Sequence, residues 1–347
     1  MASVSIPAAT LAYARLKKDA REAGIFERSL SFYAALVLFA FLGYGLSVWA
    51  ILVAGNYALL ALACLSFSFF SVQFGGLMHD CGHRAVFASI KNNDILGYIC
   101  SALLGMVFDN WKSRHNAHHG HPNEADLDPD MEIPFIAISE ELYLRKSGLQ
   151  RWLVAFQAFY YYPLGAIVSF SNRLGAVSYF LRDRSRASVW KVAVYAGGVF
   201  FLFVSPFIFF PLEKALFVFA LVHVSSGIYL ANCFAPNHKG MPQVDASDNM
   251  SFLEQQVITA RNVRGGFLTD LLLVGLNHQT EHHLFPYTPR NKLGLLKPYV
   301  QKVCEELGIE FTEVGFVETN RILVRELANV PRAARQAQVS ARLATAD

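Results

Sequence analysis

The sequence predicts an all-α integral membrane protein with four transmembrane helices in two hairpins, interfacial helices and a histidine-rich cytoplasmic cap. Hydrophobic residues make up 54% of the 347 residues and charged residues only 16%, whereas soluble domains carry about 25% charged residues. The 50 residues from 29 to 78 contain no charged residue and no histidine. Nine of the eleven histidines fall in three short clusters. A membrane scaffold that carries a histidine site accounts for all three observations.

The first hairpin follows a polar leader. Residues 1–29 form this leader, which we expect to be cytoplasmic, because eight charged side chains lie between residues 8 and 28. The uncharged run that follows divides at Gly55-Asn56 into spans of about 30–54 and 57–78. Each exceeds the roughly 20 residues that a transmembrane helix needs.

The second hairpin comprises spans of about 192–211 and 215–236, separated by a break at Pro211–Lys214. Two segments between the hairpins are predicted to be helices in the membrane interface. Residues 95–108 are apolar but too short to cross, and residues 152–180 mix aromatic side chains with polar ones. The alternative for 152–180 is a fifth crossing, which would place the later histidines on the opposite face.

The distribution of basic residues predicts the orientation. Of 30 lysines and arginines, only Lys214 lies in a connection on the far side of the membrane. The positive-inside rule therefore places both termini and the central region in the cytoplasm. Residues 30–310 form the membrane domain, and 311–347 a cytoplasmic C-terminal segment whose Ala/Arg-rich tail, from Pro331, is expected to be disordered.

Composition also excludes some functions. The net charge is only +3, and no basic run interleaves with aromatic residues, so nucleic acid is not an expected partner. The five cysteines form no CxxC pair, which argues against a disulfide framework or a thiolate metal site. We expect these cysteines to be packing residues.

The histidine clusters all lie at the cytoplasmic ends of the predicted spans. The first is an HxxxH at 79–83 that continues span two, the second an HxxHH at 115–119 before span three, and the third a QxxHH at 279–283 after span four. Burying so many neutral imidazoles without partners would be costly. A shared metal site at the cytoplasmic face removes that cost.

The number of ligands predicts two metal ions. Seven or more nitrogen ligands are too many for one tetrahedral zinc, and position 80 is Asp rather than the Glu of a zinc-protease HExxH. Imidazole binds zinc, copper, iron and nickel alike. The position at the mouth of a membrane bundle favours iron, which can activate O₂ next to a lipid chain.

These clusters resemble a known family. HDCGH (79–83), HNAHH (115–119) and QTEHH (279–283), in this order with a hairpin between the last two, resemble the three histidine boxes of the membrane fatty-acid desaturases. Residues 276–286 are similar to the third box of bacterial acyl-lipid and acyl-CoA desaturases and of front-end desaturases, in which Gln replaces the first His. Residues 234–240 also resemble the bacterial branch, and the resemblance covers about 30–310.

The resemblance implies two iron ions (Fe²⁺/Fe³⁺) with O₂ as co-substrate. The implied ligands are His79, His83, His115, His118, His119, His282 and His283, with His238 as an extra ligand after the fourth span. Whether Gln279 binds iron directly, through water or not at all stays open, and His278 and His121 match no ligand position. His223 is expected to be a packing residue. Candidates to accept the second N–H of the ligands are Asp80, Asp109, Asp270 and Glu281, with Glu124, Asp126 and Asp128 as further acids.

The implied activity is O₂-dependent insertion of a C=C bond into the fatty-acyl chain of an acyl-CoA or a membrane lipid, without catalytic residues beyond the metal ligands. The sequence has no flavin, iron–sulfur or haem motif, so the electrons would come from a separate donor, ferredoxin with its reductase or cytochrome b5. The implied location is a bacterial cell membrane. A lipid or alkane hydroxylase of the same superfamily is an alternative. A histidine-rich metal-binding or transport protein is another alternative. A transport path would require metal ligands within the spans, but only His223 lies deep within one.

Overall fold

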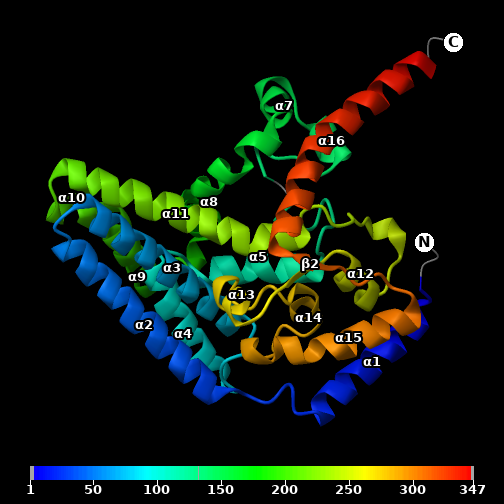
Figure 1. Ribbon diagram of the computed structural model, residues 1–347, viewed down its shortest axis with the longest axis horizontal. Coiled ribbons are helices and arrows are strands. Elements are labelled where there is room, and N and C mark those ends of the chain that lie inside the picture. Colours follow the sequence, from blue (N-terminus) through cyan, green and yellow to red (C-terminus); the bar gives the residue numbers. More distant parts are fainter. Residues whose placement is uncertain (1–3, 132, 345–347) are drawn as a thin grey trace.

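The computed structural model describes residues 4–131 and 133–344, which form a helical membrane bundle joined to a helical cap (Figure 1). Its central helices are α2 (Leu30–Val53), α3 (Tyr57–Gly82), the α9–α10 unit (Val189–Phe209) and α11 (Leu212–His238). Within the described ranges these four are long and apolar enough to cross a membrane, as the sequence predicts. The bent pair α7 (Gly148–Val154) and α8 (Gln157–Arg182) would be a fifth candidate.

The bundle presents apolar side chains on its outside. Trp49 is 61% exposed, and Leu46 and Leu62 are similarly uncovered. A hydrocarbon environment accommodates such a surface, because a soluble monomer rarely exposes a large contiguous apolar patch. The α2–α3 hairpin turns at Asn56, whose side chain accepts a hydrogen bond from the Leu59 amide (2.9 Å) and so caps α3.

The segment expected as one interfacial helix at 95–108 is instead part of a helical hairpin. α4 (Ile90–Leu103) ends at a turn, and α5 (Phe108–Gly120) returns from it. Gly105 makes this turn with a φ of +59°, a conformation that glycine adopts without strain. The Tyr44 hydroxyl of α2 donates to the Leu103 carbonyl (3.1 Å), so the tip of the hairpin packs inside the bundle. This return carries α5 back toward the end of α3.

The segment 152–180 is likewise two helices rather than one, because α7 and α8 meet at an angle of 105°. α8 packs along α11, where a Cβ on Gly227 would lie 2.6 Å from the Gly165 carbonyl oxygen. The crossing therefore requires glycine at position 227. Phe159 on α8 is 85% exposed and Trp152 on α7 is 60% exposed.

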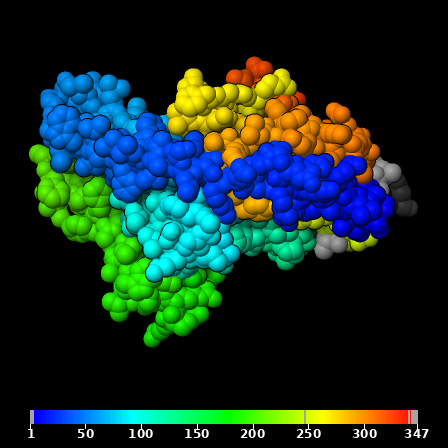
Figure 2. Space-filling view, turned by 90° about the horizontal axis from the view of Figure 1, so that it is seen from below, coloured from blue at the N-terminus to red at the C-terminus, as the bar shows by residue number. Residues whose placement is uncertain are grey.

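The cap joins elements from both ends of the chain. It contains α1 (Ile6–Glu22), α12 (Phe252–Ile258), α13 (Phe267–Leu272), α14 (Gln279–Leu284) and α15 (Leu293–Leu307). α1 lies beside α15 (Figure 2), and the two share a core that includes Leu16 and Val300. Strands β1 (Asn262–Arg264) and β2 (Glu313–Gly315) pair in parallel. The Val263 amide donates to the Asn277 carbonyl (2.9 Å), which ties the residues just before α14 to this strand.

The expectation of a disordered tail from Pro331 is wrong for the described part of the tail, because α16 runs from Phe316 to Ala344. Alanine and arginine are strong helix formers. Val330 and Ala334 are buried in one cluster with Tyr143 of α6 (Glu140–Arg145). Residues 345–347 of the expected tail lie outside the described residues.

Candidate metal centre

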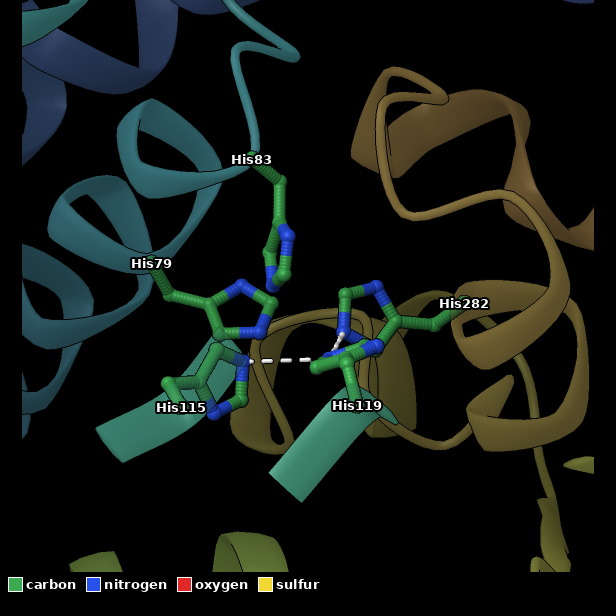
Figure 3. A group of neighbouring side chains, drawn as sticks. All are labelled: His79, His83, His115, His119 and His282. Atoms are coloured by element: carbon green, nitrogen blue, oxygen red, sulfur yellow. Dashed lines mark hydrogen bonds between the residues drawn. The ribbon is translucent and has the colours of Figure 1, made fainter. Parts of the chain in front are cut away.

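Five histidines from three helices converge on one point (Figure 3). Their ring nitrogens lie within 4.8 Å of one another, and the group comprises His79, His83, His115, His119 and His282. His79 lies on α3 and His83 is the residue that directly follows this helix, whereas two members come from α5; each pair is spaced i, i+4 and so points to one side. His282 comes from α14. We call these residues the five-histidine group.

A second set lies beside the first. His118, His238 and His283 also bring ring nitrogens within 4.8 Å of one another, and we call them the three-histidine group. The two His-His pairs explain the division, because consecutive residues of a helix point about 100° apart. One member of each pair thus joins each group, and His238 at the end of α11 completes the second.

The nitrogen separations suit shared metal ions. Nε2 of His119 lies 3.2 Å from Nε2 of His115 and 3.0 Å from Nε2 of His282. In the three-histidine group, Nε2 of His118 lies 3.3 Å from Nε2 of His238. Nitrogens that bind one metal at about 2.1 Å stand about 3.0–3.4 Å apart in octahedral or tetrahedral geometry. The measured separations fall in this interval.

Several of these imidazoles carry a buried nitrogen without a protein partner. Nε2 of His79, His83 and His283 is buried and makes no hydrogen bond. Buried polar atoms are normally satisfied, so such orphans in a native structure call for an additional partner. Three orphaned lone pairs directed at two histidine clusters fit bound metal ions.

In the three-histidine group, the protein holds the opposite nitrogen of each ring. Nδ1 of His118 donates to Asp128 (2.9 Å), and Nδ1 of His283 donates to Oε1 of Gln256 (2.8 Å). Nδ1 of His238 donates to a backbone carbonyl, that of residue 259 (3.0 Å). A neutral imidazole that donates through Nδ1 has its lone pair on Nε2. These contacts therefore select the tautomer that can bind a metal inside the group.

One of the predicted carboxylate partners, Asp80, occupies the expected position. Its Oδ1 lies 3.2 Å from Nδ1 of His79, and its Oδ2 accepts hydrogen bonds from Tyr33 (3.1 Å) and Arg290 (2.9 Å). Asp128, which was a further candidate acceptor, is the partner of His118. Burial alone would raise the pKa of Asp128, but the hydrogen bond from His118 lowers it below its usual value.

The other predicted carboxylate partners lie elsewhere, and the structure corrects these assignments. Asp109 accepts hydrogen bonds from Tyr98 (2.8 Å) and Lys191 (2.5 Å). Glu281 is fully buried and accepts from Asn262 (2.7 Å).

Asp270 lies 3.4 Å from His278, a histidine that belongs to neither group. Glu124 accepts from His121 (2.8 Å), whose side chain is 47% exposed and also outside both groups. His223 is buried in mid-helix and bonded to Ser169 (2.9 Å). Sequence analysis missed Gln256 of α12 and Thr259, which directly follows that helix, because no motif marks them.

Gln279 lies at the edge of the three-histidine group. Its side-chain amide nitrogen is 2.8 Å from Nε2 of His238, and its oxygen accepts from Asn237 (3.1 Å). The side chain is almost completely buried. Gln279 therefore contacts a candidate ligand directly.

Burial keeps five of the imidazoles neutral. Burial is the largest effect and lowers the pKa of His83, His115, His119, His282 and His283 well below its usual value. Neighbouring imidazoles lower it further, because two adjacent positive charges repel. At neutral pH these side chains are thus in the form that binds a metal.

A cavity of about 580 Å³ runs past the histidines into the bundle. Near its outer end the wall includes Arg114 and Asp130, whose side chains are about half exposed. Its deep wall is largely apolar and includes Phe67, Leu202 and Val222, with Ser169, Arg173 and His223 as polar members. Histidines of both groups line it, namely His79, His115, His118 and His238. An apolar chain in this cavity would pass directly beside both groups.

Comparison with known proteins gives a consistent result. The sequence profile of the family described as "Fatty acid desaturase" matches residues 55–315. The chain is 30% identical over 291 residues to an acyl-lipid (9-3)-desaturase of Physcomitrium patens, covering 80% of this chain and 54% of that protein. It is 27% identical over 338 residues to a Delta(8)-fatty-acid desaturase of Euglena gracilis, covering 93% and 79%.

A Delta(6)-fatty-acid desaturase of Caenorhabditis elegans is 26% identical over 275 residues, covering 74% of this chain and 62% of that protein. The chain thus spans about half the length of the first of these relatives. All three relatives are eukaryotic, and the bacterial branch and bacterial membrane stay predictions.

Proposed function

Because the chain belongs to the fatty acid desaturase family, we propose that it inserts a C=C bond into a fatty-acyl chain with O₂ as the oxidant. One observation carries this proposal: two groups of neutral histidines line an apolar cavity that reaches into a membrane bundle. A methylene group has no acidic proton and no leaving group. Removing its hydrogen therefore requires an oxidising metal centre rather than a nucleophile and a base.

The proposed ligands are the members of the two groups. The five-histidine group would hold one iron ion and the three-histidine group the other, with Gln279 beside the second ion. When bound, the two irons would supply the O₂ activation that abstracts hydrogen from an unactivated CH₂. The orphaned nitrogens and the metal-like spacing of the imidazoles support this assignment.

The remaining residues orient the histidine ligands and enclose the acyl chain. Asp80, Asp128 and Gln256 hold ligand tautomers through Nδ1. Trp111 stacks on His115 with 4.6 Å between the ring centroids, which restricts the rotation of that imidazole. The apolar deep wall excludes water and extends the acyl chain past the metal site.

The substrate would be an acyl-CoA or a membrane lipid, and the electrons would come from ferredoxin or cytochrome b5. Such donors are small acidic proteins, and the proposed cytoplasmic face carries exposed basic residues such as Arg182, Arg184 and Arg186. Opposite charges accelerate encounter between the partners. The proposal places both termini and the metal site in the cytoplasm.

The function is tested by expressing the full chain in a host that lacks the product and mapping double bonds by mass spectrometry. A new alkene supports the proposal, whereas a new alcohol would identify a hydroxylase. Unchanged lipids, with iron bound and a competent donor present, would reject both. His118→Ala and His283→Ala should abolish the product while membrane insertion persists. His121→Ala is the matched control, because that ring lies outside both groups.

The orientation is tested by labelling introduced cysteines with a membrane-impermeant thiol reagent. The native cysteines are buried, so the background should be low. Lys214→Cys should react in intact cells, and Lys18→Cys only after the membrane is opened. The reverse pattern would place the metal site on the outer face.

A further inference from the structure

Lys239 is a buried cation in the wall of the cavity. It follows His238 directly in sequence, is only 8% exposed and lines the same cavity as the histidines. The backbone of Lys239 is fixed by Arg261, which donates a hydrogen bond to the Lys239 carbonyl (2.8 Å). The backbone of Lys239 is thus fixed beside a member of the three-histidine group, and its side chain extends from there along the cavity wall to the Asp130 carbonyl.

The ammonium group of Lys239 has more donors than partners. Lysine has three N–H donors, and Lys239 uses one of them on the Asp130 carbonyl (2.9 Å). Within residues 4–131 and 133–344, no carboxylate lies within ion-pair distance of it. Burying a charge with unused donors is costly unless another acceptor satisfies it. A wall that served only an alkyl chain would be more stable with an apolar residue here.

The location of Lys239 restricts what that acceptor can be. Its partner Asp130 lies near the outer end of the cavity, whereas the far end is lined by Phe67, Leu202 and Val222. An acyl chain that enters with its methyl end first brings its carbonyl group to the outer part. The carbonyl oxygen is the first strong acceptor on such a substrate, whether the carrier is an ester, a thioester or an amide.

We propose that Lys239 binds the carbonyl oxygen of the acyl group and so sets the distance between the carbonyl carbon and the metal site. This inference rests on the proposed function. A fixed carbonyl position determines which pair of methylenes lies beside the histidines. Lys239 is therefore a positioning residue that selects the bond to be desaturated.

Lys146 provides a matched control. Its ammonium group also donates to a backbone carbonyl of the 129–138 segment, that of Ile133 (3.1 Å), but Lys146 does not line the cavity. Loss of either side chain removes one lysine-to-carbonyl hydrogen bond from the same segment. Only Lys239 should affect substrate position.

The experiment compares iron-loaded full-length wild type with Lys239→Met, Lys239→Arg and Lys146→Met in membranes. Iron per chain, kcat, KM and double-bond positions are measured with one acyl substrate. A hydrogen bond to a charged group contributes enough that Lys239→Met should lower kcat/KM roughly 10- to 100-fold. Its products should spread over neighbouring positions while iron content is retained. Lys239→Arg should retain more kcat/KM but shift the main position, and Lys146→Met should match wild type.

Two results would overturn the inference. One is that Lys239→Met and Lys239→Arg both give the wild-type double-bond position and KM. The other is that both variants lose iron and kcat together with an unchanged product position, which is the signature of a structural role. Failure of the proposed function itself is distinct, because wild type would then form no alkene.

Discussion

The two histidine groups lie side by side but differ in how completely the protein encloses a metal. The five-histidine group offers five imidazoles from α3 and its C-terminal cap, α5 and α14. The three-histidine group offers three, from α5, α11 and α14, with the Gln279 amide against one of them. An ion in the first group would be nearly saturated by protein nitrogen. An ion in the second would have positions left for other ligands.

The second group is also the better oriented of the two. All three of its members donate through Nδ1 to a fixed acceptor, respectively a carboxylate, a backbone carbonyl and a side-chain amide. In the first group, His119 keeps a buried Nδ1 without a partner. Metal binding in the three-histidine group thus depends on the orientation of its ligands, whereas metal binding in the five-histidine group depends on the number of its ligands.

The largest expected effect comes from removing a ligand from each group in turn. His283→Ala leaves two imidazoles in its group, and we expect iron to fall from two ions per chain to one. His115→Ala leaves four imidazoles in its group, so more than one ion per chain should be retained. Both changes should reduce activity by more than the roughly 10- to 100-fold typical of losing an outer partner of a ligand.

Iron per chain is measured on purified protein by elemental analysis, with desaturation assayed in membranes. His121→Ala is the control, because its exposed ring belongs to neither group. Equal iron loss from His115→Ala and His283→Ala would show that the two groups do not differ in the way that their ligand counts indicate.

The next effect concerns orientation. Asp128→Asn removes the charged acceptor of His118, and such outer partners typically contribute roughly 10- to 100-fold in metal affinity or activity. We expect faster iron release to a chelator, with one of the two ions affected. Asp109→Asn is the comparison, because that carboxylate is partly buried and hydrogen-bonded but bonds Tyr98 and Lys191 instead of a histidine. An equal effect of both substitutions would contradict the role assigned to Asp128.

Much of the membrane scaffold could be predicted from the sequence. The uncharged run from residue 29 to 78 needs a hydrocarbon environment, and its break at Gly55-Asn56 coincides with the turn between α2 and α3. The tip of the α4–α5 hairpin could not be predicted, because it depends on a φ of +59° at Gly105 and on its tertiary contact with α2. Hydropathy distinguishes apolar from polar, but not a surface helix from an inserted one.

The convergence of the histidine clusters was predictable from topology, but their division was not. Residues 118 and 119 are neighbours in sequence and serve different groups, because their side chains leave α5 in different directions. Asp109 was misassigned for the same reason. It lies six residues before His115, which is about 240° around the helix. Proximity in sequence to a histidine cluster is therefore a poor guide to contact with it.

A smaller effect is expected at Gln279, where a fourth imidazole could bring the second group closer to the first. Gln279→His places a nitrogen ligand beside His238, and we expect severalfold slower loss of iron to a chelator. Gln279→Leu should speed that loss by a similar factor, because it removes the side-chain amide that lies 2.8 Å from Nε2 of His238. Identical release rates for wild type, Gln279→His and Gln279→Leu would place Gln279 outside the metal site.

The smallest effect is on the stability of the metal-free protein as a function of pH. Burial lowers the pKa of His83, His115, His119 and His282 in the first group and of His283 in the second. The unfolded chain therefore binds more protons than the folded chain once the pH falls below the ordinary histidine value of about 6.5. The free energy of unfolding is therefore at its full value above that pH and decreases below it. We expect the thermal midpoint in detergent to fall by several degrees between pH 7.5 and 5.5.

A variant and bound metal both test whether the buried histidines cause this pH dependence. His115→Ala removes one buried histidine of lowered pKa and should make the decrease in the midpoint shallower. Bound metal should suppress the decrease in wild type, because a proton must then displace the metal before it binds. A midpoint independent of pH in the metal-free protein would mean that the imidazoles are hydrated, and the buried metal centre would need to be revised.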